Sequence, residues 1–186
     1  FLSENGFATL GDVPTDLLAN ILLNHVIAGS VSSTDLATLG AGYSTTNATN
    51  ADGDNLSLYF NTTEGVRFNG VSSVAAADVV TTNGIIHAID AVIPIPTVVT
   101  FAAADPNFST LVTALTTLTP ATDFATILSN PEGLFTVFAP TNNAFTTFLT
   151  NNNLLIFGFL QCFYNLFSAE IMVNRRSINW RNYAVL

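Results

Sequence analysis

Two kinds of apolar periodicity in one chain predict an α+β fold. Leu56, Leu58 and Phe60 alternate with other residues, as the side chains of a half-buried strand do. In 105–115 and 124–128, apolar residues recur three and four positions apart, as on one face of a helix. Hydrophobic residues make up 49% of the 186 residues and charged residues only 9%, which argues against intrinsic disorder. Helices combined with antiparallel hairpins indicate the α+β class.

The first 55 residues are predicted to contain a helix, a strand, a helical turn and a loop. The turn Asp12–Thr15 is expected to cap a helix, and the residues expected on its buried face are Leu17, Leu18, Ile21 and Leu22. Leu23–Ile27 is interpreted as a short strand that ends at Gly29. Ser32–Leu39 is interpreted as a helical turn with Leu36 and Leu39 inward. Residues 41–55 are rich in Asn, Thr, Gly and Asp, so they are expected to form a surface loop.

Strands dominate the next forty residues. A turn at 61–65 separates the alternating run of Leu56–Phe60 from Val66 and Phe68, which predicts a hairpin. One or two further strands are expected within 77–93, closed by Pro94 and Pro96.

Helices are predicted again after Thr97. Asp105 is expected to cap a helix that has Pro106 at its first position, and a second helix is expected at 124–128. The apolar run 133–138 is interpreted as a buried strand that stops at Pro140. Thr141 then caps a helix by accepting from amides of its first turn.

Two stretches of the chain resemble boxes of the fasciclin-like domain family. Residues 136–145 read TVFAPTNNAF, and residues 83–90 read NGIIHAID. The resemblance covers most of residues 1–153 and implies a compact β wedge or sandwich with flanking helices. His87, Asp90, Pro140 and Thr141 belong to these boxes, which makes them structural-motif residues.

The boxes stand in the reverse of the family's order, because the closing box precedes the opening one. We therefore interpret residues 1–96 as the C-terminal part of one fasciclin-like domain and residues 97–153 as the N-terminal part of the next. FLSEN at 1–5 and FLTNN at 148–152 support this division, with an offset of one domain length. The two parts could also close on each other as circularly permuted halves or swap with a second copy, which would bring Phe138 or Phe145 against strands within 56–93.

Residues 154–186 differ from the rest of the chain. They hold the only Cys, Met and Trp and three of the four arginines. We interpret them as an atypical hydrophobic tail produced by a frameshift or read-through. The alternative is a membrane segment, because 154–169 carries no charge, although it is shorter than a spanning helix requires.

Charge and composition exclude several functions. Residues 1–153 hold twelve acidic residues and one basic residue, Arg67, a net charge of −11. A nucleic-acid backbone would be repelled by such a surface. The chain has no lysine and no Gly-x-Ser-x-Gly sequence, and residues 1–153 have no thiol. No catalytic residue, cofactor site or metal site is predicted. Residues 50–55 depart from a calcium loop because Asn55 stands where that loop needs Gly.

The two histidines are interpreted as structural first. On a strand His87 would share a face with Ile85 and Ile89, while Asp90 would point to the opposite face, so the two are not expected to form a catalytic pair. A backbone hydrogen bond is the expected role of His87. Asn24 and His25 occupy the positions of the family's Tyr-His pair, which is associated with adhesion. They are the candidate adhesion contacts, with Asn24 in place of the tyrosine.

The resemblance implies a non-enzymatic extracellular or cell-surface module that acts in adhesion or matrix binding as tandem domains. The expected partner is a cell-surface protein or a polysaccharide. A small-ligand or lipid-binding domain and a membrane-tethered structural protein are the alternatives. Attachment to a membrane would follow only if the tail is genuine.

Overall fold

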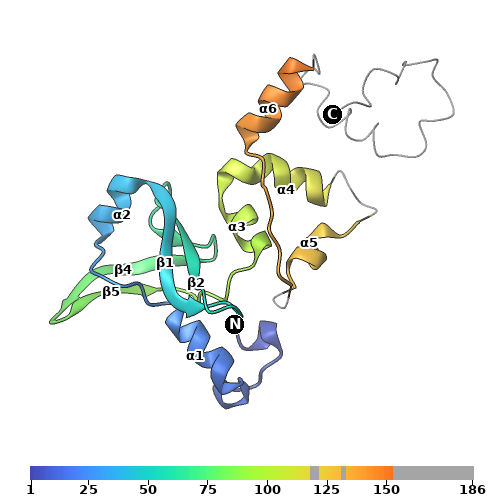
Figure 1. The fold of residues 1–186 in the computed structure, drawn as a ribbon. Coiled ribbons are helices and arrows are strands. Elements are labelled where there is room, and N and C mark those ends of the chain that lie inside the picture. Colours follow the sequence, from blue (N-terminus) through green and yellow to red (C-terminus); the bar gives the residue numbers. More distant parts are fainter. Residues whose placement is uncertain (118–121, 131–132, 153–186) are drawn as a thin grey trace, which may run out of the picture.

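The computed structural model describes residues 1–117, 122–130 and 133–152. An antiparallel sheet with two helices against it lies beside a group of four helices (Figure 1). The elements are η1 Ser3–Asn5, η2 Leu10–Asp12, α1 Thr15–Leu23, α2 Ser33–Leu39, β1 Ala41–Thr49, β2 Asn55–Asn61, β3 Arg67–Phe68, β4 Ser72–Thr81, β5 Gly84–Ile89, α3 Val98–Ala104, η3 Pro106–Phe108, α4 Ser109–Thr116, α5 Phe124–Leu128 and α6 Asn142–Asn151. This arrangement confirms the α+β class.

The sheet is a meander in which each strand pairs with the next along the chain, in the order β1-β2-β3-β4-β5. The predicted hairpin is present, with Phe60 opposite Phe68 and Asn61 opposite Arg67. β5 lies within the range 77–93 that was expected for further strands, and β4 begins before this range and ends inside it. Short connections between antiparallel neighbours account for this simple topology.

The prediction of a surface loop over 41–55 is wrong for most of its length. Residues 41–49 form β1, paired antiparallel with β2, and only 50–54 form a turn. Exposed and less exposed side chains alternate along β1, with Thr46 and Ala48 buried. Threonine suits such a half-buried pleated surface because it is β-branched. The high Asn and Gly content masked this alternation.

The core lies between the sheet, helix α2 and the segment that joins α1 to α2, which contributes Ile27 and Val31. Its buried residues are Leu36, Leu58, Phe60, Phe68 and Ile93. Leu36 therefore points inward as predicted, but Leu39 is 67% exposed. Helix α2 ends at Leu39, where Gly40 turns the chain with a φ of 75°, so the last side chain is carried off the core.

Helix α1 is present after the turn 12–15, but that turn does not cap it and the helix buries a narrower stripe than expected. Ile21 is buried, whereas Leu17 and Leu22 are exposed, because this short helix packs chiefly against β1. Its start has no side-chain cap. Asp12 accepts instead from the amide and hydroxyl of Thr9, which caps the preceding turn η2.

The predicted caps of the helical group are present. The carboxylate of Asp105 accepts from the amide of Asn107, with Pro106 at the first position of η3, and α4 follows directly. Helix α5 covers the predicted range 124–128. Thr141 caps α6 by accepting from the amide of Ala144 at 3.3 Å.

The buried strand expected at 133–138 is not formed. The segment runs beside the helical group instead of joining the sheet (Figure 1). Phe138 is 92% exposed, so the expected contact between Phe138 and the strands at 56–93 is absent. Residues 133–138 therefore do not close the sheet as a strand. A strand needs a neighbouring strand to pair with its amides and carbonyls. The segment 133–138 has none among the described residues, because it lies beside the helices that follow the sheet.

Replacing Phe60 with Ala tests the position of the core. The ring of Phe60 is 4% exposed, so its removal should lower the free energy of unfolding by about 3–5 kcal/mol through lost burial and a cavity. Urea unfolding followed by circular dichroism measures this change. Val80→Ala is the matched control, because Val80 is 77% exposed and its loss should cost less than about 1 kcal/mol. Equal effects would contradict the proposed core.

Candidate functional site

Asn24 is buried where α1, β1 and the segment after β5 meet. Its side chain is 0% exposed. The Nδ2 group donates to the carbonyls of Pro94 at 3.0 Å and Ile93 at 3.4 Å, while Oδ1 accepts from the hydroxyl of Thr46 at 3.3 Å. Asn24 is therefore inaccessible to a partner in this fold. This burial argues against its predicted role as an adhesion contact.

His25 follows α1 and uses both ring nitrogens within the chain. Nε2 accepts from the amide of Ile93 at 2.9 Å, so Nδ1 carries the proton and donates to the carbonyl of Ile21 at 2.7 Å. The predicted strand 23–27 is wrong, because α1 runs to Leu23 and only an isolated bridge joins Ile27 to Thr46. The residue as a whole is exposed, and an adhesion contact through His25 stays a prediction.

His87 and Asp90 serve different neighbours. On β5, Nδ1 of His87 accepts from the amide of Asp78 at 3.3 Å, and Nε2 donates to the carbonyl of Val31 at 2.9 Å. Asp90 accepts from the amide of Ser73 at 2.7 Å. Both side chains thus hold backbone of β4, at two separate residues, and His87 also holds the segment before α2. His87 has the backbone hydrogen bonds expected from its position in the sequence.

A cluster around Asp78 joins the β4–β5 hairpin to α2. Asp78 lies at a register shift of β4 with a φ of 59°, and its carboxylate accepts from the amide of Ser33 at 2.8 Å and from the Ser33 hydroxyl. The Ser33 hydroxyl, and then its amide, hold the pKa of the Asp78 carboxyl below its ordinary range.

Sequence reasoning missed this cluster. Its short-range contacts could have been predicted, because Ser32 and Asp35 have the spacing of a capping box and form one at the start of α2. The hydroxyl and amide of Ser32 lower the pKa of Asp35. The distant half, the approach of Asp78 to Ser33, left no periodic signal in the sequence.

Tyr43 links the sheet to the helical group. Its hydroxyl donates to the Asp105 carboxylate at 3.0 Å, and its ring lies 5.1 Å from that of Tyr59 and 5.5 Å from that of Phe101, between ring centroids. Burial, and then the bond to Asp105, raise the pKa of Tyr43. Asp105 is itself 6% exposed, so this contact holds a carboxylate away from solvent.

The remainder of this sheet face is open and polar. Thr45, Asn47, Thr49 and Ser57 share it by alternation along β1 and β2, where Thr45 lies opposite Ser57, and all four are exposed. None of them is charged. We name these four residues the β1–β2 polar face.

Residues 50–54, next to this face, form a turn. Asn50 accepts from the amides of Asp52 at 3.0 Å and Asp54 at 2.8 Å, which is an Asx-type turn. Across the described ranges, no cluster of three His, Cys, Asp or Glu side chains could hold a metal ion.

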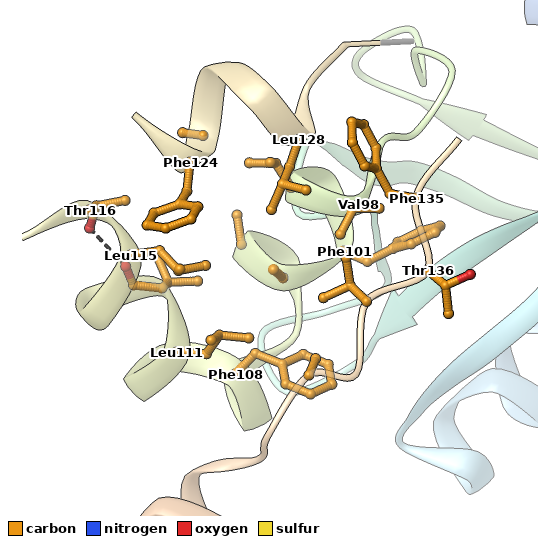
Figure 2. Close-up of a pocket in the computed structure, with 17 residues that line it drawn as sticks. Val98, Phe101, Phe108, Leu111, Leu115, Thr116, Phe124, Leu128, Phe135 and Thr136 are labelled. Carbon is orange, nitrogen blue, oxygen red and sulfur yellow. Dashed lines mark hydrogen bonds between the residues drawn. The ribbon is translucent and has the colours of Figure 1, made fainter. Parts of the chain in front are cut away.

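An apolar cavity of about 440 Å³ lies within the helical group. Figure 2 shows Phe124, Leu128, Leu115 and Phe101 around it. Its walls come from α3, η3, α4, α5 and residues 135–139, and no charged residue lines it. Such a size and lining are typical of small-molecule sites.

A family model for the Fasciclin domain matches residues 2–96 and 106–156. The two matched stretches suggest tandem segments. Fasciclin domains are in general adhesion modules without enzymatic activity, found outside cells or at the cell surface. No curated protein matches the chain. In the described part of the chain, no helix is both long and apolar enough to cross a bilayer, and the tail at 154–186 lies outside that part.

Replacing Asp78 with Asn tests the cluster at α2. The lowered pKa of Asp78 means that its stabilising contribution is present above the unfolded-state value and is lost as pH falls through the folded-state value. Asn tolerates the positive φ and keeps an acceptor oxygen but does not titrate. The wild type should therefore lose more stability than Asp78→Asn between about pH 5 and about pH 2. Melting temperatures of both proteins across this range measure the difference, and parallel curves would contradict it.

Proposed function

Because the chain belongs to the Fasciclin domain family, we propose that it is a non-enzymatic extracellular module of cell adhesion or matrix binding. Its partner is a cell-surface protein or a polysaccharide rather than a nucleic acid. The segments 1–96 and 97–153 act as parts of consecutive domains in a tandem array. Repeated weak contacts along such an array would raise the overall affinity through avidity.

The β1–β2 polar face carries this proposal. Hydroxyl and amide groups of Thr45, Asn47, Thr49 and Ser57 are exposed together on the β1–β2 pair. Side chains of this kind both donate and accept, so they match the hydroxyl groups of a sugar chain. They require no positive charge in a strongly acidic protein. The proposed contact surface therefore moves from Asn24 to this face.

The structural use of the titratable side chains supports a non-enzymatic role. His25, His87, Asp78 and Asp90 all hold backbone groups. Asp105 is bonded to Tyr43 and Asn107. These hydrogen bonds give each of the side chains a structural role.

Triple replacement of Thr45, Asn47 and Ser57 with Ala tests the face. These side chains form no hydrogen bonds with other described residues, so the fold should persist. Retention on a glycan array or on cell surfaces should weaken by about tenfold or more, because each lost hydrogen bond contributes about 0.5–1.5 kcal/mol. The proteins are produced in bacterial cells, so that the N-glycosylation sequence Asn-x-Ser/Thr at Asn47 carries no glycan.

The matched control replaces Thr34, Thr82 and Thr147 with Ala. These threonines are exposed elsewhere on the chain and are likewise without side-chain bonds to described residues, so binding should be unchanged. If the wild type retains neither cells nor glycans, the proposed function is wrong. If both triple variants bind like wild type, the proposed face is wrong.

A second function is favoured by the apolar cavity. We propose that it takes an uncharged apolar small molecule, such as an acyl chain or an aromatic ring system, because its 440 Å³ are lined by side chains such as Phe101, Leu111 and Phe124. The volume lies within the range of about 300–1,000 Å³ of ligand pockets. Polar contribution is limited to groups such as the hydroxyls of Thr116 and Thr136.

Ala102→Leu tests this binding. Ala102 lines the cavity, and three added carbon atoms should weaken binding of the neutral dye Nile red by about fivefold or more, since overpacking costs about 1–3 kcal/mol. Fluorescence titration measures the affinity. Ala37→Leu, on an exposed position of α2, should leave it unchanged. If Ala102→Leu leaves the affinity for the dye unchanged, the dye binds elsewhere. The absence of any dye binding would contradict the proposal.

A further inference from the structure

The segment Leu134–Ala139 is extended and has no backbone partner among the described residues. Neither its amides nor its carbonyls form a backbone hydrogen bond there. Phe135 and Val137 line the apolar cavity but stay 40% and 41% exposed, and on the other side Leu134 is 73% and Phe138 92% exposed. An uncharged extended segment with free backbone groups and exposed apolar side chains is a site for pairing with a strand.

The sheet offers one edge that fits this strand. In the order β1-β2-β3-β4-β5 the two edge strands are β1 and β5. The outer edge of β1 is partly covered, because the amide of Asn47 donates to the carbonyl of Val26 at 2.9 Å and Thr46 forms a bridge with Ile27. For β5, the ladder in the described residues is with β4 only.

The β5 edge matches the segment in length and chemistry. β5 spans six residues, Gly84–Ile89, the same number as 134–139, and neither stretch contains a charged residue. Ile86 is 56% exposed on β5, and beside it Val79 and Val80 of β4 are 49% and 77% exposed. Pairing would cover apolar surface on both sides.

We propose that Leu134–Ala139 of one copy of this chain adds as a strand to the β5 edge of a second copy. Every copy carries both halves of the contact, in two stretches that the same family model matches. The absence of charge at both surfaces also allows contact between two strongly acidic chains. Strand addition of this kind obtains its affinity from main-chain hydrogen bonds. This inference does not depend on the adhesion proposal.

The contact joins different surfaces of the two copies, so its geometry has two outcomes. Two copies that exchange strands reciprocally form a closed dimer, whereas successive addition forms an open array. Either assembly presents several β1–β2 polar faces at once.

Proline substitution of the full chain tests the pairing. Thr136→Pro and Val137→Pro each remove one amide, and adjacent amides of a strand point to opposite sides. Both amides are unpaired within the described chain, so the circular dichroism of the protein should not change. We expect sedimentation velocity at about 1–200 µM to show concentration-dependent association of wild type, lost in at least one proline variant. Thr136→Val keeps the amide and should associate like wild type.

Cross-linking tests the location. In a Cys162→Ser background, copies with Thr136→Cys are mixed with copies with Ala88→Cys, and mass spectrometry reads the mixed disulfide. A mixed disulfide that disappears with the effective proline substitution supports the contact. A wild type that stays monomeric, association unaffected by both prolines, equal loss in Thr136→Val, or no mixed disulfide would each overturn it.

Discussion

The hydrogen bonds from Asn24 and His25 to Ile93 and Pro94 hold the N-terminal part of the structure together. Three backbone groups at the exit of the sheet would otherwise be unpaired near the core, and buried unpaired groups cost about 1–3 kcal/mol each. Asn24 also bonds to Thr46 of β1. Helix α1, the first strand and the chain after the last strand are thus fixed at one point, and Ile93 is held in the core beside Leu58 and Phe60. Asn24 occupies a position associated with adhesion in the fasciclin-like family, but in this chain its side chain stabilises the fold.

The same use of polar groups explains what remains for function. Both imidazoles and several carboxylates hold turns, caps and strand ends. The uncharged surfaces proposed for recognition are the hydroxyls and amides on β1 and β2 and the apolar side chains in the helical group. Neutral polar surface suits sugars and polar protein surfaces, and an apolar cavity suits uncharged small molecules. These two surfaces belong to different parts of the chain. Either can be altered without the other, which keeps the two proposed activities separable by mutation.

Local rules predicted much of the fold, and long-range contacts account for the failures. The β2–β3 hairpin and the caps at Asp105 and Thr141 followed from spacing within a few residues, and the structure contains them. The strand β1 was missed because its partner, not its composition, makes it a strand, and β-propensity depends strongly on context. Burial of Asn24 and the approach of Asp78 to Ser33 depend on pairs 45 or more positions apart. No periodic pattern encodes such pairs, so the polar face and the cavity could not be located from the sequence.

The position of Leu134–Ala139 shows how one contact can decide between two uses of a segment. Tyr43 and Asp105 attach the helical group to the sheet through a partly buried hydrogen bond. Ala104 packs against Gly70, where a Cβ atom would come within 3.2 Å of the alanine side chain. Gly70 also has a φ of 68°, so this close approach depends on glycine. With α3 fixed there, α4 and α5 draw Phe135 and Val137 to their own apolar side. Two apolar side chains of this segment therefore pack against the helices, while its backbone groups form no hydrogen bonds with described residues. An apolar strand in that state has more to gain from a free sheet edge than from solvent, which is why the interaction between copies follows from the packing within one copy.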